Sequence, residues 1–212
     1  MTKLLLIRHG QSEANLQGLF AGHWDTPLTQ LGKTQAEITG AYIAKNYTVD
    51  VVYTSDLQRA AAVGQAVSIA TGAPITATES LREIRAGEWE TVSFEELNKN
   101  WPSFQVWLKD IGIAGCDGGE TVAQLQERVV AAVSKIAEDH PEQTVVLTTH
   151  ATAIRALQCY CEGKTLAQMK DIPWVANTSI TELTYEKGAF SVVRVNGTEH
   201  LGNAASTLPA NV

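Results

Sequence analysis

The sequence predicts an α/β fold, a three-layer α/β/α sandwich with a mostly parallel central sheet. Short apolar, β-branched segments alternate with longer amphipathic ones, which is the pattern of strands joined by crossover helices. The 212 residues suffice for one core, and 44% hydrophobic with 18% charged residues is a globular composition. No repeat, linker or change of composition divides the chain, so we expect a single domain over residues 1–212.

The expected strands are apolar or β-branched runs bounded by turn residues. They cover residues 3–8, 51–55, 75–77, 144–149, 180–185 and 190–195. The last two are joined through Lys187-Gly188, which predicts a terminal hairpin. The segment 197–212 carries no such pattern and is expected to be a coil-like tail.

The expected helices repeat apolar residues every three to four positions. They cover residues 29–46, 56–71, 94–110, 121–139 and 151–161. In the first of these, Leu31, Ile38 and Tyr42 fall near one face and predict its buried side. Pro102 is expected to break the third, because proline removes a backbone donor from the helix.

Capping boxes predict where two of these helices begin. Thr121 with Gln124 marks the start of the helix over residues 121–139, and Ser55 with Gln58 marks a start at residue 56. The helix over 121–139 is the clearest, because five apolar residues form one stripe along it: Val122, Leu125, Val129, Val133 and Ile136.

Charge and hydropathy exclude several classes of partner. The formal charge is -7 and no basic stripe is present, so we expect no nucleic-acid partner. No run approaches the roughly 20 apolar residues that span a bilayer, and we expect no membrane association. Cys116, Cys159 and Cys161 lack a zinc-ligand pattern, and reduced thiols in a cytoplasmic protein are the simplest interpretation. The oligomeric state stays open.

Polar residues follow three of the expected strands. Arg8 and His9 end the first, Arg59 lies one helical turn beyond the second, and His150 ends the fourth along the chain. Ligands of open α/β sheets bind beyond the carboxyl ends of the strands. Two histidines and two arginines should therefore gather at one edge of the sheet.

Arg59 is placed unusually for a cation. In the first turn of a helix it opposes the helix dipole, at a cost of about 0.3–1 kcal/mol unless an anion is bound there. A salt bridge to Asp56 or Glu37 is the alternative, and the position alone does not choose. Beside Arg8 and two histidines, an anion site is the better interpretation.

The two strand-end histidines suit phosphoryl transfer. Neutral imidazole can attack phosphorus directly, since its unperturbed pKa lies near 6.5. Metal ligation is the rival, but no carboxylates converge on His9 or His150 in the sequence, and we expect no metal and no other cofactor. His23, His140 and His200 are expected at the surface.

The ordered motifs resemble those of the histidine phosphatase superfamily, in its phosphoglycerate-mutase-like branch. The first is the Arg-His-Gly signature at residues 8–15, RHGQSEAN. The others follow in order to about residue 156: FAGHWDTPL (20–28), GKTQA (32–36), YTSDLQRA (53–60), LREI (81–84), GGET (118–121) and THA (149–151).

This resemblance implies the roles of individual residues. His9 would be the nucleophile that becomes phosphohistidine, and Arg8, Arg59 and His150 would surround the phosphoryl group. Glu83 would be the general acid and later the base that activates water. The remaining implied contacts to substrate come from the Asn15 amide and from the backbone at Ala21 and Gly22.

Two features qualify these assignments. Glu79, Glu88 and Glu90 lie near Glu83 in the sequence, and spacing alone does not choose among them. Ala151 stands where the family commonly has glycine, and Ala21 replaces a threonine-like hydroxyl before Gly22 and leaves only backbone contacts there.

A phosphatase acting on small-molecule phosphate monoesters is favoured over a phosphoglycerate mutase. Where mutases place Arg and Tyr for the substrate, this chain has Ile84 and Ala86. Residues 93–118 offer only two cations, Lys99 and Lys109, and their aromatic residues would either pack as ordinary helix or form an apolar lid over the site. A non-catalytic phospho-ligand binding module is the third hypothesis.

Overall fold

Strand β1 (Thr2–Arg8) lies inside the sheet because its side chains are apolar on both faces. The structure is a computed structural model that describes residues 1–208. Its six-stranded sheet has the order β3-β2-β4-β1-β5-β6. The strands β2 (Val51–Ser55), β3 (Ile75–Thr78) and β4 (Thr144–Thr149) run parallel to β1, whereas β5 (Ile180–Glu186) and β6 (Ala189–Gly197) form the antiparallel hairpin. The mostly parallel sheet is confirmed.

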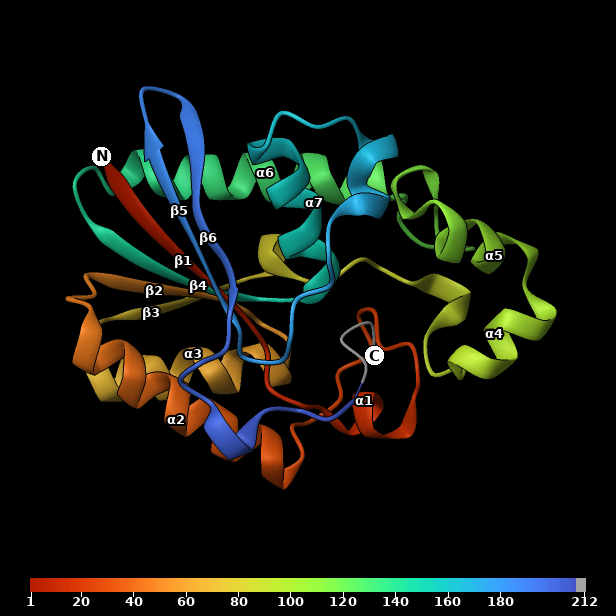
Figure 1. Ribbon diagram of the computed structural model, residues 1–212, viewed down its shortest axis with the longest axis horizontal. Helices are drawn as coiled ribbons and strands as arrows, with labels where there is room; N and C mark the ends of the chain where they lie inside the picture. Colours follow the sequence, from red (N-terminus) through yellow and green to blue (C-terminus); the bar gives the residue numbers. More distant parts are fainter. Residues whose placement is uncertain (209–212) are drawn as a thin grey trace.

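Helices cover both faces of this sheet (Figure 1). One face carries α2 (Gln30–Asn46) and α3 (Gln58–Thr71), and the other carries α6 (Val122–Asp139) and α7 (Ala151–Cys161). The alternation along β1 divides the core accordingly, because Leu4 and Leu6 belong to one buried cluster and Leu5 and Ile7 to the other. The three-layer sandwich predicted from the sequence is confirmed.

The buried side of α2 differs from the prediction. Leu31, Ile38 and Tyr42 are only partly buried. Of the residues that pack inward, Ile43 is large and apolar, and the other five are small or polar: Gly32, Gln35, Ala36, Thr39 and Gly40. The cause is the close approach of α2 to α3, where a Cβ on Gly40 would lie 2.7 Å from the backbone oxygen of Ala66.

The predicted helix starts are right in one case and wrong in the other. Thr121 and Gln124 form the capping box of α6, and its five-residue stripe is buried. By contrast, α3 begins at Gln58 with Leu57 as an N-cap that makes no side-chain hydrogen bond. The Ser55 hydroxyl accepts instead from the backbone N–H of Leu57 and contacts His150. Its hydroxyl therefore serves the strand end and not the helix cap.

The segment after β3 extends beyond the carboxyl edge of the sheet (Figure 1). As predicted, it breaks before Pro102, into α4 (Phe94–Asn100) and α5 (Pro102–Lys109). The short helix α1 (Glu13–Gln17) was not predicted from the sequence, because five residues are too few to show a helical periodicity. The 3-10 turns such as η4 (Leu166–Asp171) and η5 (Gly202–Ala204) were also not predicted. Residues 209–212 of the expected tail lie outside the described part.

Within residues 1–208, we find no helix that combines the length and the apolar character needed to cross a membrane.

Candidate active site

The carboxyl ends of β1, β2 and β4 meet at one edge of the sheet and bring the predicted histidines together. Arg8 pairs in register with Thr149, so His9 and His150 follow on adjacent strands. Their ring centroids lie 5.2 Å apart. Beside them is a cavity that opens to solvent, with about 510 Å³ of empty space when the open solvent is included. Its lining includes seven of the eight predicted site residues, namely Arg8, His9, Asn15, Ala21, Gly22, Arg59 and Glu83. The eighth, His150, is fully buried against the ring of His9.

His9 is held as a neutral imidazole with one nitrogen that bonds no residue within 1–208. Its Nδ1 lies 2.7 Å from the carbonyl oxygen of Gly10. A carbonyl can only accept, so Nδ1 carries the proton and Nε2 keeps its lone pair. Burial, followed by the charges of Arg59 and Arg8, holds the pKa of His9 well below its ordinary value of 6.5. The ring can therefore act as a nucleophile at neutral pH.

His150 is also neutral in the free site. Its Nε2 lies 2.9 Å from the hydroxyl oxygen of Ser55, and its buried Nδ1 has no hydrogen-bond partner among residues 1–208. Burial, then the charges of Arg59 and His9, lower its pKa well below 6.5. The positive charge of the free site therefore comes from the arginines, not from an imidazolium.

Arg8 and Arg59 are buried cations fixed by backbone carbonyls. Arg8 donates through Nη1 to Val175 at 2.7 Å. Arg59 donates through Nη1 to Trp24 at 3.0 Å and through Nη2 to Gly22 at 2.7 Å. Burial lowers the pKa of each arginine to about 10, which leaves both charged at neutral pH. Two fixed cations in a cavity suit an anion such as phosphate.

The salt bridge considered for Arg59 is not formed. Asp56 pairs with Arg82 instead, whose Nε donates to Oδ1 at 2.7 Å. Glu37 is exposed on α2 and makes no ion pair with any described residue. This arrangement favours the anion-site interpretation of Arg59.

Geometry distinguishes Glu83 from the neighbouring carboxylates. Its Oε1 accepts from the backbone N–H groups of Ile84 at 3.0 Å and Ala153 at 3.2 Å, and its Oε2 accepts from Thr152 at 3.0 Å. These bonds hold the carboxylate at the start of α7, where it lines the cavity. Glu79 and Glu88 are exposed, and Glu90 accepts from backbone N–H groups of residues 23 and 86.

The three residues predicted to contact substrate, Asn15, Ala21 and Gly22, line the cavity. Asn15 accepts through Oδ1 from Ser12 at 3.1 Å and from Asn177 at 3.3 Å, which leaves its Nδ2 as a donor. Gly22 has φ 53°, and a Cβ there would lie 2.5 Å from Cβ of Ala86. Only glycine fits this close approach, which lets the Gly22 carbonyl reach Arg59.

The sequence missed several residues of the site. His23 was expected at the surface, but it is half-buried and its Nε2 lies 2.9 Å from the backbone oxygen of Glu83. Asn177 donates to the backbone oxygen of His9 at 3.2 Å, and Trp174 lines the cavity. All three lie on loops, where no periodic pattern indicates which way a side chain points.

The aromatic residues of the segment 93–118 partly pack in the core and partly line the cavity. Phe94 and Trp107 line the cavity, while Phe104 and Trp107 pack with Phe20 and Trp89 in edge-to-face contacts. Leu108 is exposed. An apolar wall thus adjoins the arginines, and movement of this segment as a lid stays a prediction.

No group of three or more His, Cys, Asp or Glu residues within positions 1–208 is arranged to hold a metal ion. The cations nearest the cavity are the guanidinium groups already described.

Comparisons with known proteins point to one family. Phosphoserine phosphatase 1 of Hydrogenobacter thermophilus is 29% identical over 203 residues, which cover 95% of each chain. The glucosyl-3-phosphoglycerate phosphatase of Mycolicibacterium vanbaalenii is 27% identical over 91% of each chain. Among solved structures, Bacillus stearothermophilus YhfR superimposes with a TM-score of 0.90 at 28% identity, covering 95% of this chain and 100% of that one.

The family match extends further than the sequence motifs. The motifs end near residue 156, whereas the family profile also includes the hairpin of β5 and β6. Residues 4–198 match that profile, and the chain belongs to the histidine phosphatase superfamily (branch 1).

Proposed function

We propose that the chain hydrolyses small-molecule phosphate monoesters in two steps through a phosphohistidine on His9. The observation that carries this proposal is the neutral His9 ring, whose free Nε2 shares one cavity with two buried arginines and Glu83. The names of the relatives, phosphoserine phosphatase and glucosyl-3-phosphoglycerate phosphatase, support hydrolysis of small phosphate esters.

In the first step, Nε2 of His9 attacks phosphorus and the bond from phosphorus to the ester oxygen breaks. Protonated Glu83 gives its proton to that leaving oxygen. In the second step, the Glu83 carboxylate takes a proton from water, whose oxygen attacks phosphorus and breaks the P–N bond. Arg8, Arg59 and the Asn15 amide stabilise the phosphoryl oxygens in both steps, so neither a metal nor another cofactor is required.

Hydrolysis is favoured over mutase chemistry by the residues after Glu83. Ile84 and Ala86 are both 0% exposed, so their side chains belong to the core and leave no substrate-binding group at these positions. The same proposal includes a cytoplasmic location, which the three free thiols support, because reduced cysteines persist in reducing compartments.

The test is a panel of phosphate monoesters in which phosphate release and 3-phosphoglycerate isomerisation are both measured. We expect net phosphate release without a bisphosphoglycerate primer, and an acid-labile phosphate on His9 after rapid quenching. His9→Ala should abolish turnover, and His140→Gln, which alters a histidine hydrogen-bonded to Tyr53, is the matched control. Isomerisation faster than hydrolysis would replace the phosphatase with a mutase, and normal turnover by His9→Ala would rule out the covalent step.

A further inference from the structure

A second cavity adjoins the first behind the aromatic wall. It has about 560 Å³ of empty space when the open solvent is included, and it shares Phe94, Trp107 and Trp174 with the first cavity. Its charged lining residues are both cations, Arg155 and Lys170. The prediction of few cations near the site was based on residues 93–118 alone. Arg155 and Lys170 lie outside that segment, on α7 and η4.

Arg155 is a buried cation with unused hydrogen-bonding capacity. It is 2% exposed, and it donates through Nε and Nη2 to the Ile172 carbonyl at 3.0 and 2.7 Å, and through Nη2 to Met169 at 3.1 Å. Its guanidinium carbon lies 4.0 Å from the centre of the Trp174 ring. The buried Nη1 has no hydrogen-bond partner, and no carboxylate within residues 1–208 forms an ion pair with this side chain.

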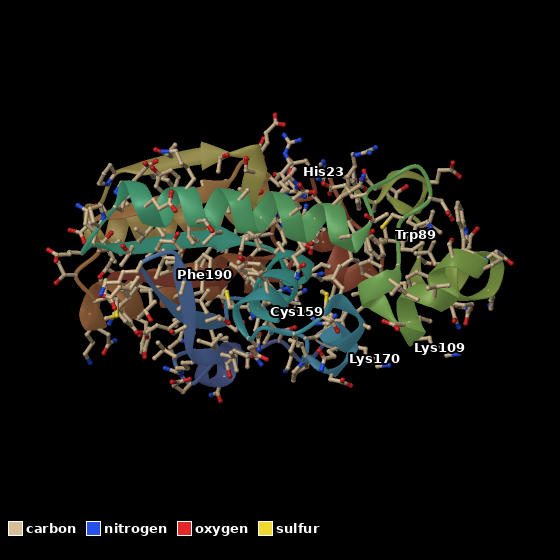
Figure 2. The ribbon with its side chains drawn as sticks, turned by 90° about the horizontal axis from the view of Figure 1, so that it is seen from above. His23, Trp89, Lys109, Cys159, Lys170 and Phe190 are labelled. Carbon is tan, nitrogen blue, oxygen red and sulfur yellow. The ribbon has the colours of Figure 1, made fainter. Side chains whose placement is uncertain are left out.

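A buried charge without a counter-ion is costly, because it loses its hydration and gains no opposite charge in return. The Met169 and Ile172 carbonyls offset part of this cost, as does the face of Trp174. Lys170 adds a second, exposed positive charge to the same cavity. In Figure 2 it lies at the same end of the molecule as Lys109, which is not among the lining residues. An anion entering this cavity would meet two cations and no competing carboxylate.

We propose that the second cavity binds a carboxylate on the alcohol portion of the substrate, at Arg155 and Lys170. The preferred substrates are then phosphate monoesters that carry a carboxylate separated from the phosphate by a flat or apolar spacer. The phosphate lies at His9, the spacer lies against Phe94, Trp107 and Trp174, and the carboxylate lies in the second cavity. This inference rests on the proposed function, because the phosphate end is placed by His9.

The alternative is that Arg155 only fastens η4 to α7 through the Met169 and Ile172 carbonyls. The two roles make different predictions for Lys170, whose side chain does not bond the Met169 or Ile172 carbonyl. If Arg155 is purely structural, the enzyme should hydrolyse an ester with a carboxylate and an ester with a neutral group of the same shape at equal rates.

The experiment compares two esters with the same phenol leaving group, 3-(4-phosphonooxyphenyl)propanoate and its primary amide. We expect wild-type kcat/KM to be about tenfold higher for the carboxylate, as for a hydrogen bond to a charged group. Lys170→Ala should lower this ratio at least about threefold, and Lys170→Glu should lower it further. Arg155→Met should bring the ratio near one. Lys109→Ala, the matched control at the same end of the molecule, should leave the ratio and both rates unchanged.

Each result of this experiment supports or overturns either the second site or the phosphatase activity. Equal wild-type rates on the two esters would overturn the second site and leave the phosphatase intact. A preference for the carboxylate ester that is unchanged in both Lys170 variants would also overturn the second site. Because Lys170 is exposed, these two variants test the proposal even if Arg155→Met does not fold. Hydrolysis of neither ester by wild type, together with inactivity on the wider panel, would overturn the proposed function and this inference with it.

Discussion

The rings of His9 and His150 lie with their centroids 5.2 Å apart and their planes inclined by 56°. Each ring uses one nitrogen within the protein, Nδ1 of His9 with Gly10 and Nε2 of His150 with Ser55. The Ser55 oxygen also accepts from the backbone N–H of Leu57, so one hydroxyl joins the start of α3 to the ring of His150. His9 thus presents a lone pair to the cavity, whereas Nδ1 of His150 is buried and bonds no described residue.

The buried histidines should make stability depend on pH. Their folded pKa values lie well below 6.5, so below that pH the unfolded chain binds more protons than the folded one. The free energy of unfolding should therefore fall as the pH falls from about 7 to 5, by up to about 1.4 kcal/mol per pH unit for each histidine. Urea unfolding across this range measures it. His150→Gln should show a shallower dependence, and an unchanged slope would show that His150 is protonated in the folded state.

Removing the Arg59 guanidinium should impair catalysis strongly. Arg59→Lys keeps a charge but cannot bond both Gly22 and Trp24 as the guanidinium does. We expect kcat/KM for 4-nitrophenyl phosphate to fall about 10²–10³-fold in Arg59→Ala, as when one oxyanion donor is lost, and less in Arg59→Lys. Arg194→Lys, on β6, is the control. A loss below about fivefold in Arg59→Ala would remove this residue from the phosphoryl site.

Glu83→Gln should separate the two proton transfers. The glutamine oxygen can still accept from backbone N–H groups, but it neither protonates a leaving oxygen nor activates water. In the burst phase, cleavage of an alkyl phosphate should slow by about 10²–10⁴-fold, whereas 4-nitrophenyl phosphate, whose leaving group needs little protonation, should slow much less. Phosphohistidine should then accumulate, because the second step lacks its base. Equal slowing of both esters in the burst would assign the proton to another group.

Activity should not need a divalent ion. Arg8 and Arg59 supply the positive charge that a metal supplies in other phosphoryl-transfer enzymes. We expect full activity after exhaustive EDTA treatment and inhibition by vanadate competitive with substrate. Activity lost on chelation and restored by one added metal would contradict the arginine-based mechanism.

The sequence predicts this fold well where side chains repeat regularly. The stripe on α6 and the apolar run of β1 give two elements nearly to the residue, and strand polarity places His9 beside His150. The prediction was wrong where one side chain serves a distant neighbour. Ser55 matches a capping box, but its hydroxyl bonds His150, which is remote in sequence.

Residues on loops were the other failure. His23 and Trp174 lie on loops and Lys170 lies on the 3-10 turn η4, so no helix or strand periodicity indicates where their side chains point. The inward face of α2 was missed for a related reason: close packing on α3 selects small residues, whereas a search for hydrophobic periodicity selects large ones. Loop positions and the packing of one helix on another both depend on tertiary contacts, which a local sequence pattern does not contain.

The central position of β1 has a consequence for biosynthesis. The strand that precedes His9 is made first, but its partners come late, since Leu4 pairs with Val145 on one side and Leu183 on the other. A nascent chain therefore holds an unpaired apolar strand until most of its length has left the ribosome, and such non-local pairing is slow. During that interval β1 is exposed to aggregation and to chaperones. A prematurely terminated chain that lacks β4 carries His9 without the Thr149 carbonyl that its backbone N–H bonds.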